Sequence, residues 1–184
     1  MKVNSSLLID DLIERTKEVI NQTETLKENS LETLNKKPNP NSWSTLECIE
    51  HLNYYGYFYL PEIKARLNNS NKKAEAVFKS GILGNYFAIS LLPKQKLNKM
   101  KTFKSMNPSN SKLNKEVLNT FLNQQQTLLK LLNKSRDYSL NKIKTSISIT
   151  KLIKIKLGDT FRVVIYHNQR HLVQALKAAK LNLP

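Results

Sequence analysis

Apolar residues recur at three- and four-residue steps along four long stretches of this 184-residue chain. That spacing places them on one face of an α-helix. The pattern predicts helices over 5–34, 44–67, 111–134 and 159–180. Asn4 or Ser5 can cap the first of these helices, and a polar segment with two prolines at 35–42 ends it.

The second stretch begins with a clear helix-start signal. Ser44 and Glu47 are spaced as a capping box, in which the serine side chain accepts from the backbone N–H of Glu47 and the glutamate reaches back. Trp43 and Cys48 occupy the two positions of a hydrophobic staple. Further along, Pro61 has no backbone N–H and is expected to kink or divide the helix.

Two connecting segments have weaker patterns. Residues 68–110 contain an apolar patch at 77–92, and we expect an irregular crossover there. A short helix over an opening in the core and an oligomer contact are the alternatives. Residues 135–158 mix isoleucine with lysine, so both helix and strand remain open. Asp159 then follows a glycine and is the expected N-cap of the last helix.

The composition favours a helical protein. Four glycines and six prolines are few for an all-β fold rich in turns. We predict an all-α, antiparallel four-helix bundle with a long crossover between the second and third helices. The length predicts a single domain over residues 1–184.

The three histidines are the candidate chemistry of the chain. His167 and His171 stand four residues apart, so a helix places both imidazoles on one face, about 6 Å apart along its axis. Two such imidazoles can ligate one metal ion. For a pair of this kind, two ordinary histidines on a surface helix are the alternative. His51 lies on the second helix, and a bundle that brings it to the pair would complete a three-histidine metal site.

The net charge of +16 raises the question of a nucleic-acid partner. Only five of the 30 basic residues are arginine, whereas surfaces that bind bases and phosphates favour arginine and interleaved aromatic residues. The densest basic run, 94–104, is predicted to be a solvated face or loop. We therefore do not expect nucleic acid to be a partner.

The sequence also bears on the compartment. Cys48 is the single cysteine, which rules out an intramolecular disulfide and fits a reducing compartment. The N-terminus lacks the apolar region of a signal peptide. No run approaches the roughly 18 apolar residues of a membrane span. We expect a soluble, cytoplasmic protein with no membrane partner.

The order and spacing of these motifs resemble one known family, the DinB-like superfamily. The resemblance covers nearly the whole chain, and it rests on Trp43, Ser44, Glu47 and His51, followed much later by Gly158, Asp159, His167, Arg170, His171 and Gln174. Members are described as four-helix bundles, commonly dimeric, with one divalent metal held by three histidines. The matching positions are His51, His167 and His171, and imidazole ligands suit nickel, zinc or iron.

The resemblance implies a metal-dependent enzyme that acts on a small molecule. Some relatives are thiol S-transferases that use low-molecular-weight thiols, and others are described as hydrolases. The nucleophile would be a metal-activated thiolate or water. A non-catalytic metal-binding, ligand-binding or stress-response bundle is the alternative, and a basic nucleic-acid binder is a third. Region 135–157 departs from the pattern of many relatives, which carry a His-Pro segment there.

Catalytic and substrate-binding residues beyond the metal ligands cannot be assigned from the sequence. Glu47 is expected to serve the helix cap, and Cys48 to be a small buried hydrophobe. Arg170 could orient an anionic substrate, or could be solvated or face a dimer partner. The aromatic run 54–59 and the apolar patch 82–92 exceed the needs of one small bundle, so we predict a homodimer.

Overall fold

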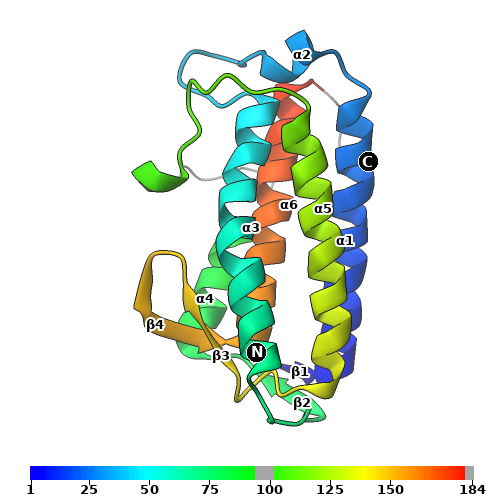
Figure 1. Cartoon of the computed structure of the whole chain (residues 1–184), viewed down its shortest axis with the longest axis vertical. Helices are drawn as coiled ribbons and strands as arrows, with labels where there is room; N and C mark the ends of the chain where they lie inside the picture. The colour runs from blue at the N-terminus through cyan, green and yellow to red at the C-terminus, as the bar shows by residue number, and fades with distance from the viewer. Residues whose placement is uncertain (94–101, 181–184) are drawn as a thin grey trace.

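The computed structural model describes residues 1–93 and 102–180, and four long helices lie side by side along its long axis (Figure 1). They are α1 (Ser5–Lys27), α3 (Thr45–Asn68), α5 (Glu116–Lys134) and α6 (Leu157–Ala178). α3 packs against α5 and α6, and α1 packs against the same two helices. α1 and α6 run in one direction, and α3 and α5 run in the other (Figure 1).

Shorter elements lie at the ends and along one side. The additional helices are α2 (Leu31–Asn35), α4 (Ile82–Leu91), which packs against α6, and single 3-10 turns at Lys104–Met106 and Ser135–Asp137. Two antiparallel strand pairs join β1 (Lys2–Asn4) to β2 (Val77–Lys79) and β3 (Lys144–Ile147) to β4 (Thr150–Lys156). None of the described helices is long and apolar enough to cross a membrane.

Two predicted helix boundaries are wrong. The helix predicted over 5–34 ends at Lys27, because Ser30 provides a new N-cap for the short α2 that follows. The third long helix begins at Glu116 and not at 111, because the side chain of Asn114 accepts from the backbone N–H of Glu116 at 2.9 Å. In both places a local hydrogen bond between a side chain and the backbone outweighs the continuing apolar pattern.

Two further expectations about the helices need correction. Pro61 does not divide α3, which is continuous from Thr45 to Asn68, while a kink at this residue stays a prediction. The carbonyl that loses its partner belongs to Tyr57, and both Tyr57 and Pro61 lie on the exposed side, where water can replace the lost hydrogen bond. Asp159 is not an N-cap, since α6 begins at Leu157 and the Asp159 carboxylate bonds to a different segment.

The two connecting segments are more regular than expected. Within 68–110 the expected irregular crossover is interrupted by β2 and by α4, so a short helix does form at Ile82–Leu91. In 135–158 the strand alternative holds, since β3 and β4 form there as an antiparallel pair. The paired residues Thr145 and Ile155 are buried, whereas the neighbouring Lys144 is exposed, as expected for side chains that alternate along a strand. Most of the basic run 94–104 lies outside the described residues.

The apolar core divides into two clusters, and each cluster draws on all four long helices. Along α5, for example, Phe121 belongs to one cluster and Leu128 to the other, with the buried Gln124 and Gln125 between them. Polar side chains separate the clusters at this level. Both clusters therefore pack the same four helices.

The buried polar residues between the clusters are bonded across helices. Asn168 Nδ2 of α6 donates to Gln125 Oε1 of α5 at 2.9 Å, and Gln124 Nε2 donates to the backbone carbonyl of Asn53 in α3 at 3.2 Å. Gly56 is needed for this approach, since a Cβ there would lie 1.9 Å from Gln124 Oε1. The glutamines that interrupt the apolar stripe of α5 therefore link it to the neighbouring α3 and, across the bundle, to α6.

A buried ion pair attaches α4 to the start of α6. Arg162 Nη1 lies 3.0 Å from Asp159 Oδ1, and both side chains are almost fully buried. The Asp159 carboxylate also accepts from the Ser80 hydroxyl and from the backbone N–H of Gly81. Arg162 Nη2 donates to Asn85 Oδ1 at 3.1 Å. Residues from two distant parts of the chain are thus held together.

Replacing Arg162 with methionine should destabilise the fold strongly, because Asp159 would stay buried without its cationic partner. Breaking a buried pair in this way costs about 3–5 kcal/mol. Arg136→Met is the matched control, because Arg136 pairs with Asp10 on the surface, where such pairs contribute about 0–1 kcal/mol. Urea unfolding followed by circular dichroism measures both. Equal losses in the two variants would contradict an anchoring role for the buried pair.

Candidate metal centre

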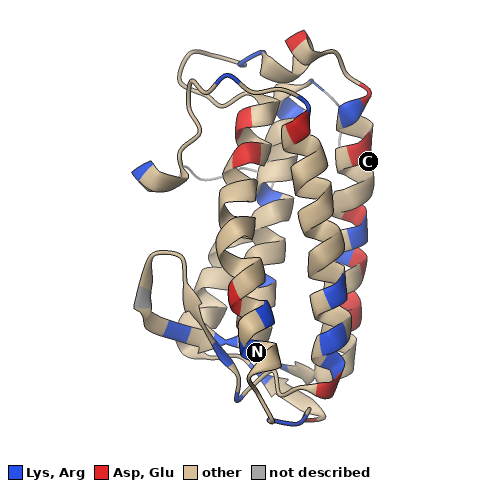
Figure 2. Cartoon of the chain, in the orientation of Figure 1, with Lys and Arg blue, Asp and Glu red and all other residues tan. Residues whose placement is uncertain are grey.

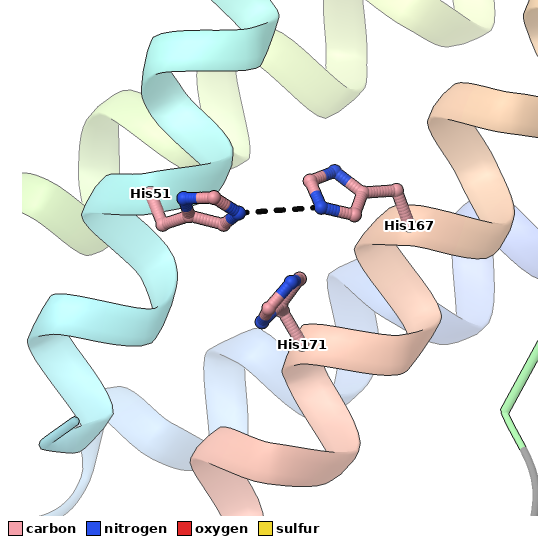
Figure 3. A group of neighbouring side chains, drawn as sticks. All are labelled: His51, His167 and His171. Atoms are coloured by element: carbon pink, nitrogen blue, oxygen red, sulfur yellow. Dashed lines mark hydrogen bonds between the residues drawn. The ribbon is translucent and has the colours of Figure 1, made fainter. Parts of the chain in front are cut away.

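His51 of α3 meets His167 and His171 of α6 in the space between the two helices (Figure 3). One ring nitrogen from each residue lies within 4.8 Å of the others. His51 Nε2 and His167 Nε2 are 3.3 Å apart, and the ring centroids of His51 and His171 are 4.5 Å apart. The structure therefore brings together the three histidines that the sequence selected, as a group that could hold a metal ion.

Two of the imidazoles are oriented through their Nδ1 atoms. His51 Nδ1 lies 2.6 Å from the backbone carbonyl oxygen of Met106, and His171 Nδ1 lies 3.0 Å from Gln174 Oε1. Because these oxygens can only accept, each Nδ1 carries the proton and each Nε2 of a neutral ring keeps its lone pair. Histidines that bind metals are commonly held in this way. The donor set fits a divalent ion of the zinc, nickel or iron type.

Burial keeps the three imidazoles neutral. Loss of water lowers the pKa of His51 to about 4 and the pKa of His171 to about 3. Burial, with the proximity of the other two histidines, lowers the pKa of His167 well below its ordinary value. Protons therefore compete for these nitrogens only at a pH below the ordinary histidine range, and all three rings are available as ligands at neutral pH.

Two aromatic side chains border the histidine group. The Trp43 ring centroid lies 4.7 Å from that of His51 and 5.7 Å from that of His171. The Tyr55 centroid lies 5.0 Å from His51 and 4.5 Å from His167. These rings replace water around the imidazoles and so contribute to the burial that lowers their pKa values.

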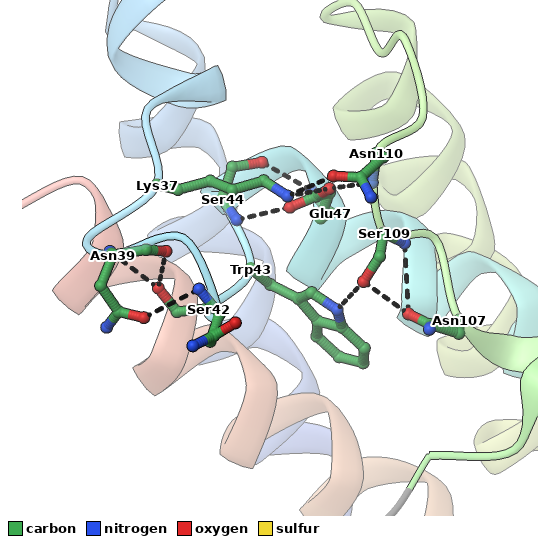
Figure 4. A network of polar contacts seen from close by, with 10 residues as sticks. Lys37, Asn39, Ser42, Trp43, Ser44, Glu47, Asn107, Ser109 and Asn110 are labelled. Atoms are coloured by element: carbon green, nitrogen blue, oxygen red, sulfur yellow. Dashed lines mark hydrogen bonds and ion pairs between the residues drawn. The ribbon is translucent and has the colours of Figure 1, made fainter.

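A polar network holds Trp43 in this position (Figure 4). Trp43 Nε1 donates to Ser109 Oγ at 2.9 Å, and Ser109 Oγ donates to Asn107 Oδ1 at 2.8 Å. Asn107 directly follows Met106, whose carbonyl orients His51. The tryptophan and the carbonyl are therefore fixed by the same loop.

Glu47 attaches that loop to the start of α3. The capping box is confirmed, with Glu47 Oε2 accepting from the Ser44 N–H at 2.8 Å and Ser44 Oγ accepting from the Glu47 N–H at 3.2 Å. Glu47 Oε1 accepts from the Asn110 N–H at 2.6 Å and pairs with Lys37 Nζ at 2.9 Å (Figure 4). Burial opposes ionisation, but these hydrogen bonds outweigh it and lower the pKa of Glu47. Both oxygens are engaged in holding structure.

Two further residues near the histidines, Cys48 and Arg170, are buried. Cys48 is fully buried in an apolar cluster, and burial raises the pKa of its thiol. It packs as expected and is not part of the histidine group. Arg170 is 4% exposed, so the alternative of a solvated arginine is wrong. Burial lowers the pKa of Arg170, and the residue lines the cavity beside the histidines.

A cavity of about 790 Å³ opens next to the three histidines. Its walls come from α3, α4, α6 and the β3–β4 hairpin, with part of the loop before α3. Small-molecule sites commonly have volumes of about 300–1,000 Å³. No aspartate or glutamate is present among the described residues that line it. The candidate metal centre is thus at the wall of a space large enough for a substrate.

Long packed helices with a histidine trio between two of them define a helical protein with a candidate metal centre. The sequence model of the DinB superfamily matches residues 12–175, and the chain belongs to this superfamily. Searches of curated proteins and of solved structures returned no match. The family resemblance is therefore confirmed, while any activity has to be argued from the site.

The sequence selected the three histidines, and the family pattern included Trp43 and Gln174, but the roles of the groups that orient and enclose the histidines were missed. The role of Gln174 could have been found, because it stands three residues after His171 on the same helix, where side chains are neighbours. Tyr55 stands one turn after His51 and could have been found in the same way. Met106 acts through its backbone carbonyl, for which no side-chain pattern gives a signal.

Replacing Gln174 with leucine should weaken zinc binding about 10- to 100-fold, because His171 Nδ1 loses its acceptor. Gln174→Glu keeps an acceptor and should bind zinc at least as tightly as the parent. Gln169→Leu is the control, since Gln169 lies on the same helix and contacts Arg15 instead. Competition against a chromophoric chelator measures all three. Equal zinc affinity in the two leucine variants would contradict this role for Gln174.

Proposed function

We propose that the protein is a divalent-metal-dependent enzyme that transfers a low-molecular-weight thiol to an electrophilic small molecule. One observation carries the proposal: three neutral imidazoles converge at the wall of a cavity of about 790 Å³. His51, His167 and His171 are the proposed metal ligands. Three protein ligands leave at least one coordination position for a substrate.

The proposed chemistry follows from the ligand set. A divalent ion held by the three histidines would lower the pKa of a bound thiol and supply a thiolate at neutral pH. The sulfur would then attack an electrophilic carbon, forming a C–S bond as the bond to the leaving group breaks and that group departs with the electron pair. The thiol proton passes to solvent. Trp43 and Tyr55 limit water at the site, while Met106 and Gln174 hold the rings in place.

Hydrolysis of a small molecule is the alternative reaction for the same site. Attack by water commonly uses a general base to take its proton. The described lining residues include no carboxylate, and both oxygens of nearby Glu47 are engaged by the cap, Lys37 and Asn110. A free thiol has a pKa of about 8.5 and water one of about 15.7, so a thiol reaches its reactive anion more readily without a base. The lining therefore supports thiol transfer over hydrolysis.

The distribution of charge supports a small molecule over nucleic acid as the partner. Figure 2 shows basic residues along the β3–β4 hairpin, and the sequence of that hairpin contains lysines and no acidic residue. At the cavity, Arg170 is the one lysine or arginine among the described lining residues. Among the described residues, the positive charge is thus spread over outer surfaces and does not gather at the histidine group.

The proposal extends to architecture and assembly. The cyclic packing of the four long helices supports a DinB-like four-helix bundle forming one domain, and the lone cysteine supports a cytoplasmic location. Exposed apolar side chains support a homodimer, with Ile82 of α4 at 95% and Tyr57 of α3 at 61% exposure. A monomer mass in sedimentation at protein concentrations on the order of tens of micromolar would reject the dimer.

The enzyme proposal is tested with zinc- or nickel-loaded protein, cysteine as the thiol and chlorodinitrobenzene as the electrophile. We expect turnover that is lost on chelation and restored by metal. His51→Ala and His171→Ala should lower the rate at least about 100-fold, because each removes a ligand. Tyr57→Ala, an exposed change on the same helix as His51, should leave the rate unchanged.

Two results would separate the alternatives. A rate that is unaffected by chelation or by the histidine substitutions would contradict metal-dependent thiol transfer. Tight metal binding that depends on the histidines, without turnover of thiols or hydrolysable esters, would favour the non-catalytic metal-binding alternative.

A further inference from the structure

The cavity beside the histidines has two chemically different parts. The histidines, with Arg170, Asn168 and Gln174, make one polar wall on α3 and α6. The remaining walls are dominated by aromatic and aliphatic side chains from α4, the hairpin and α6. We propose that the substrate has a large uncharged, apolar body that occupies this second part, and one small polar end that faces the histidines. This inference rests on the proposed function and names its substrate class.

Three elements supply much of the apolar walls. Tyr86, Phe87 and Leu91 come from α4, and Ile147 and Ile149 come from the hairpin. α6 adds two neighbouring valines in the turn before His167. A charged group placed among these side chains would lose water and gain no partner, which is strongly unfavourable. An alkyl or aromatic group would gain from leaving water.

Several polar atoms in these walls are already bonded within the protein. The Tyr59 hydroxyl accepts from the Ser148 N–H at 3.2 Å and lies 3.4 Å from Ser148 Oγ. Ser90 Oγ donates to the Phe87 carbonyl at 2.8 Å. In the polar wall, Asn168 Nδ2 likewise donates to Gln125 Oε1. Because these groups are already bonded within the protein, they offer few free hydrogen-bonding atoms to a polar substrate body.

The volume of the cavity indicates how large the apolar body of the substrate is. About 790 Å³ is more than a small thiol alone would fill, and lies in the range of sites that enclose molecules of drug size. The opening is bordered by apolar side chains that are also partly exposed, with Tyr86 at 67% and Ile149 at 56%. An apolar molecule would therefore meet an apolar surface from the entrance to the histidines.

The experiment uses a homologous series with one head group: ethanethiol, butanethiol and hexanethiol. Each displaces the neutral fluorescent probe N-phenylnaphthylamine from zinc-loaded protein. If the body lies in the apolar part of the cavity, the affinity should rise about three- to fourfold for each added methylene. Affinity that is independent of chain length would overturn the inference.

Substitutions at the exposed border test the location without disturbing the core. Tyr86→Ser and Ile149→Ser should each weaken binding of N-phenylnaphthylamine and hexanethiol at least about threefold. The matched controls are Ile82→Ser on α4 and Leu152→Ser on the hairpin, both 95% exposed and outside the cavity lining. Equal effects in the border variants and their controls would also overturn the inference.

Alcohols of the same lengths, measured in the same displacement assay, distinguish this inference from the proposed function. A thiol that contacts the metal should bind more tightly than the alcohol of equal length, and His171→Ala should remove that difference while leaving the dependence on chain length. If hexanol and hexanethiol bind equally but chain length still matters, the metal-dependent function fails and the apolar site remains. If the preference for the thiol persists but chain length has no effect, the apolar site fails and the metal-dependent function remains.

Discussion

The structure depends on the burial of three imidazoles between two helices with no acidic partner in the group. A buried charge without a partner is costly, so each ring has to remain neutral. Because the carbonyl of Met106 fixes the proton of His51 on Nδ1, its Nε2 presents a lone pair to His167. A proton on His167 Nε2 can satisfy that lone pair in the metal-free protein, and a divalent cation can satisfy all three rings at once.

The surrounding structure maintains this arrangement at both ends of the site. Two apolar clusters pack the same four helices on either side of the polar level, which fixes the separation of α3 and α6. Glu47 then connects the beginning of α3 to the loop that carries Met106 and Ser109. Neither feature contacts a substrate. Both determine where the histidine nitrogens and the Trp43 ring lie.

The sequence was informative where the cause of structure is local. The start of α3 follows from the Ser44 and Glu47 pair, and the juxtaposition of His167 and His171 follows from one helical turn. Predictions failed where a distant segment or a competing cap decides. Ser30 ends the first helix early, and the Asp159 carboxylate is directed to Gly81 and Ser80 instead of its own backbone. The encounter of His51 with the pair needed the family pattern, because no local rule specifies which helices face each other.

The most direct test of the metal centre is X-ray absorption spectroscopy at the zinc edge of the zinc-loaded protein. The account predicts three imidazole nitrogens at about 2.0–2.1 Å and a remaining position filled by a light atom. Added hexanethiol should introduce a sulfur at about 2.3 Å. A spectrum with fewer than two imidazoles, or with sulfur from Cys48 in the absence of added thiol, would contradict it.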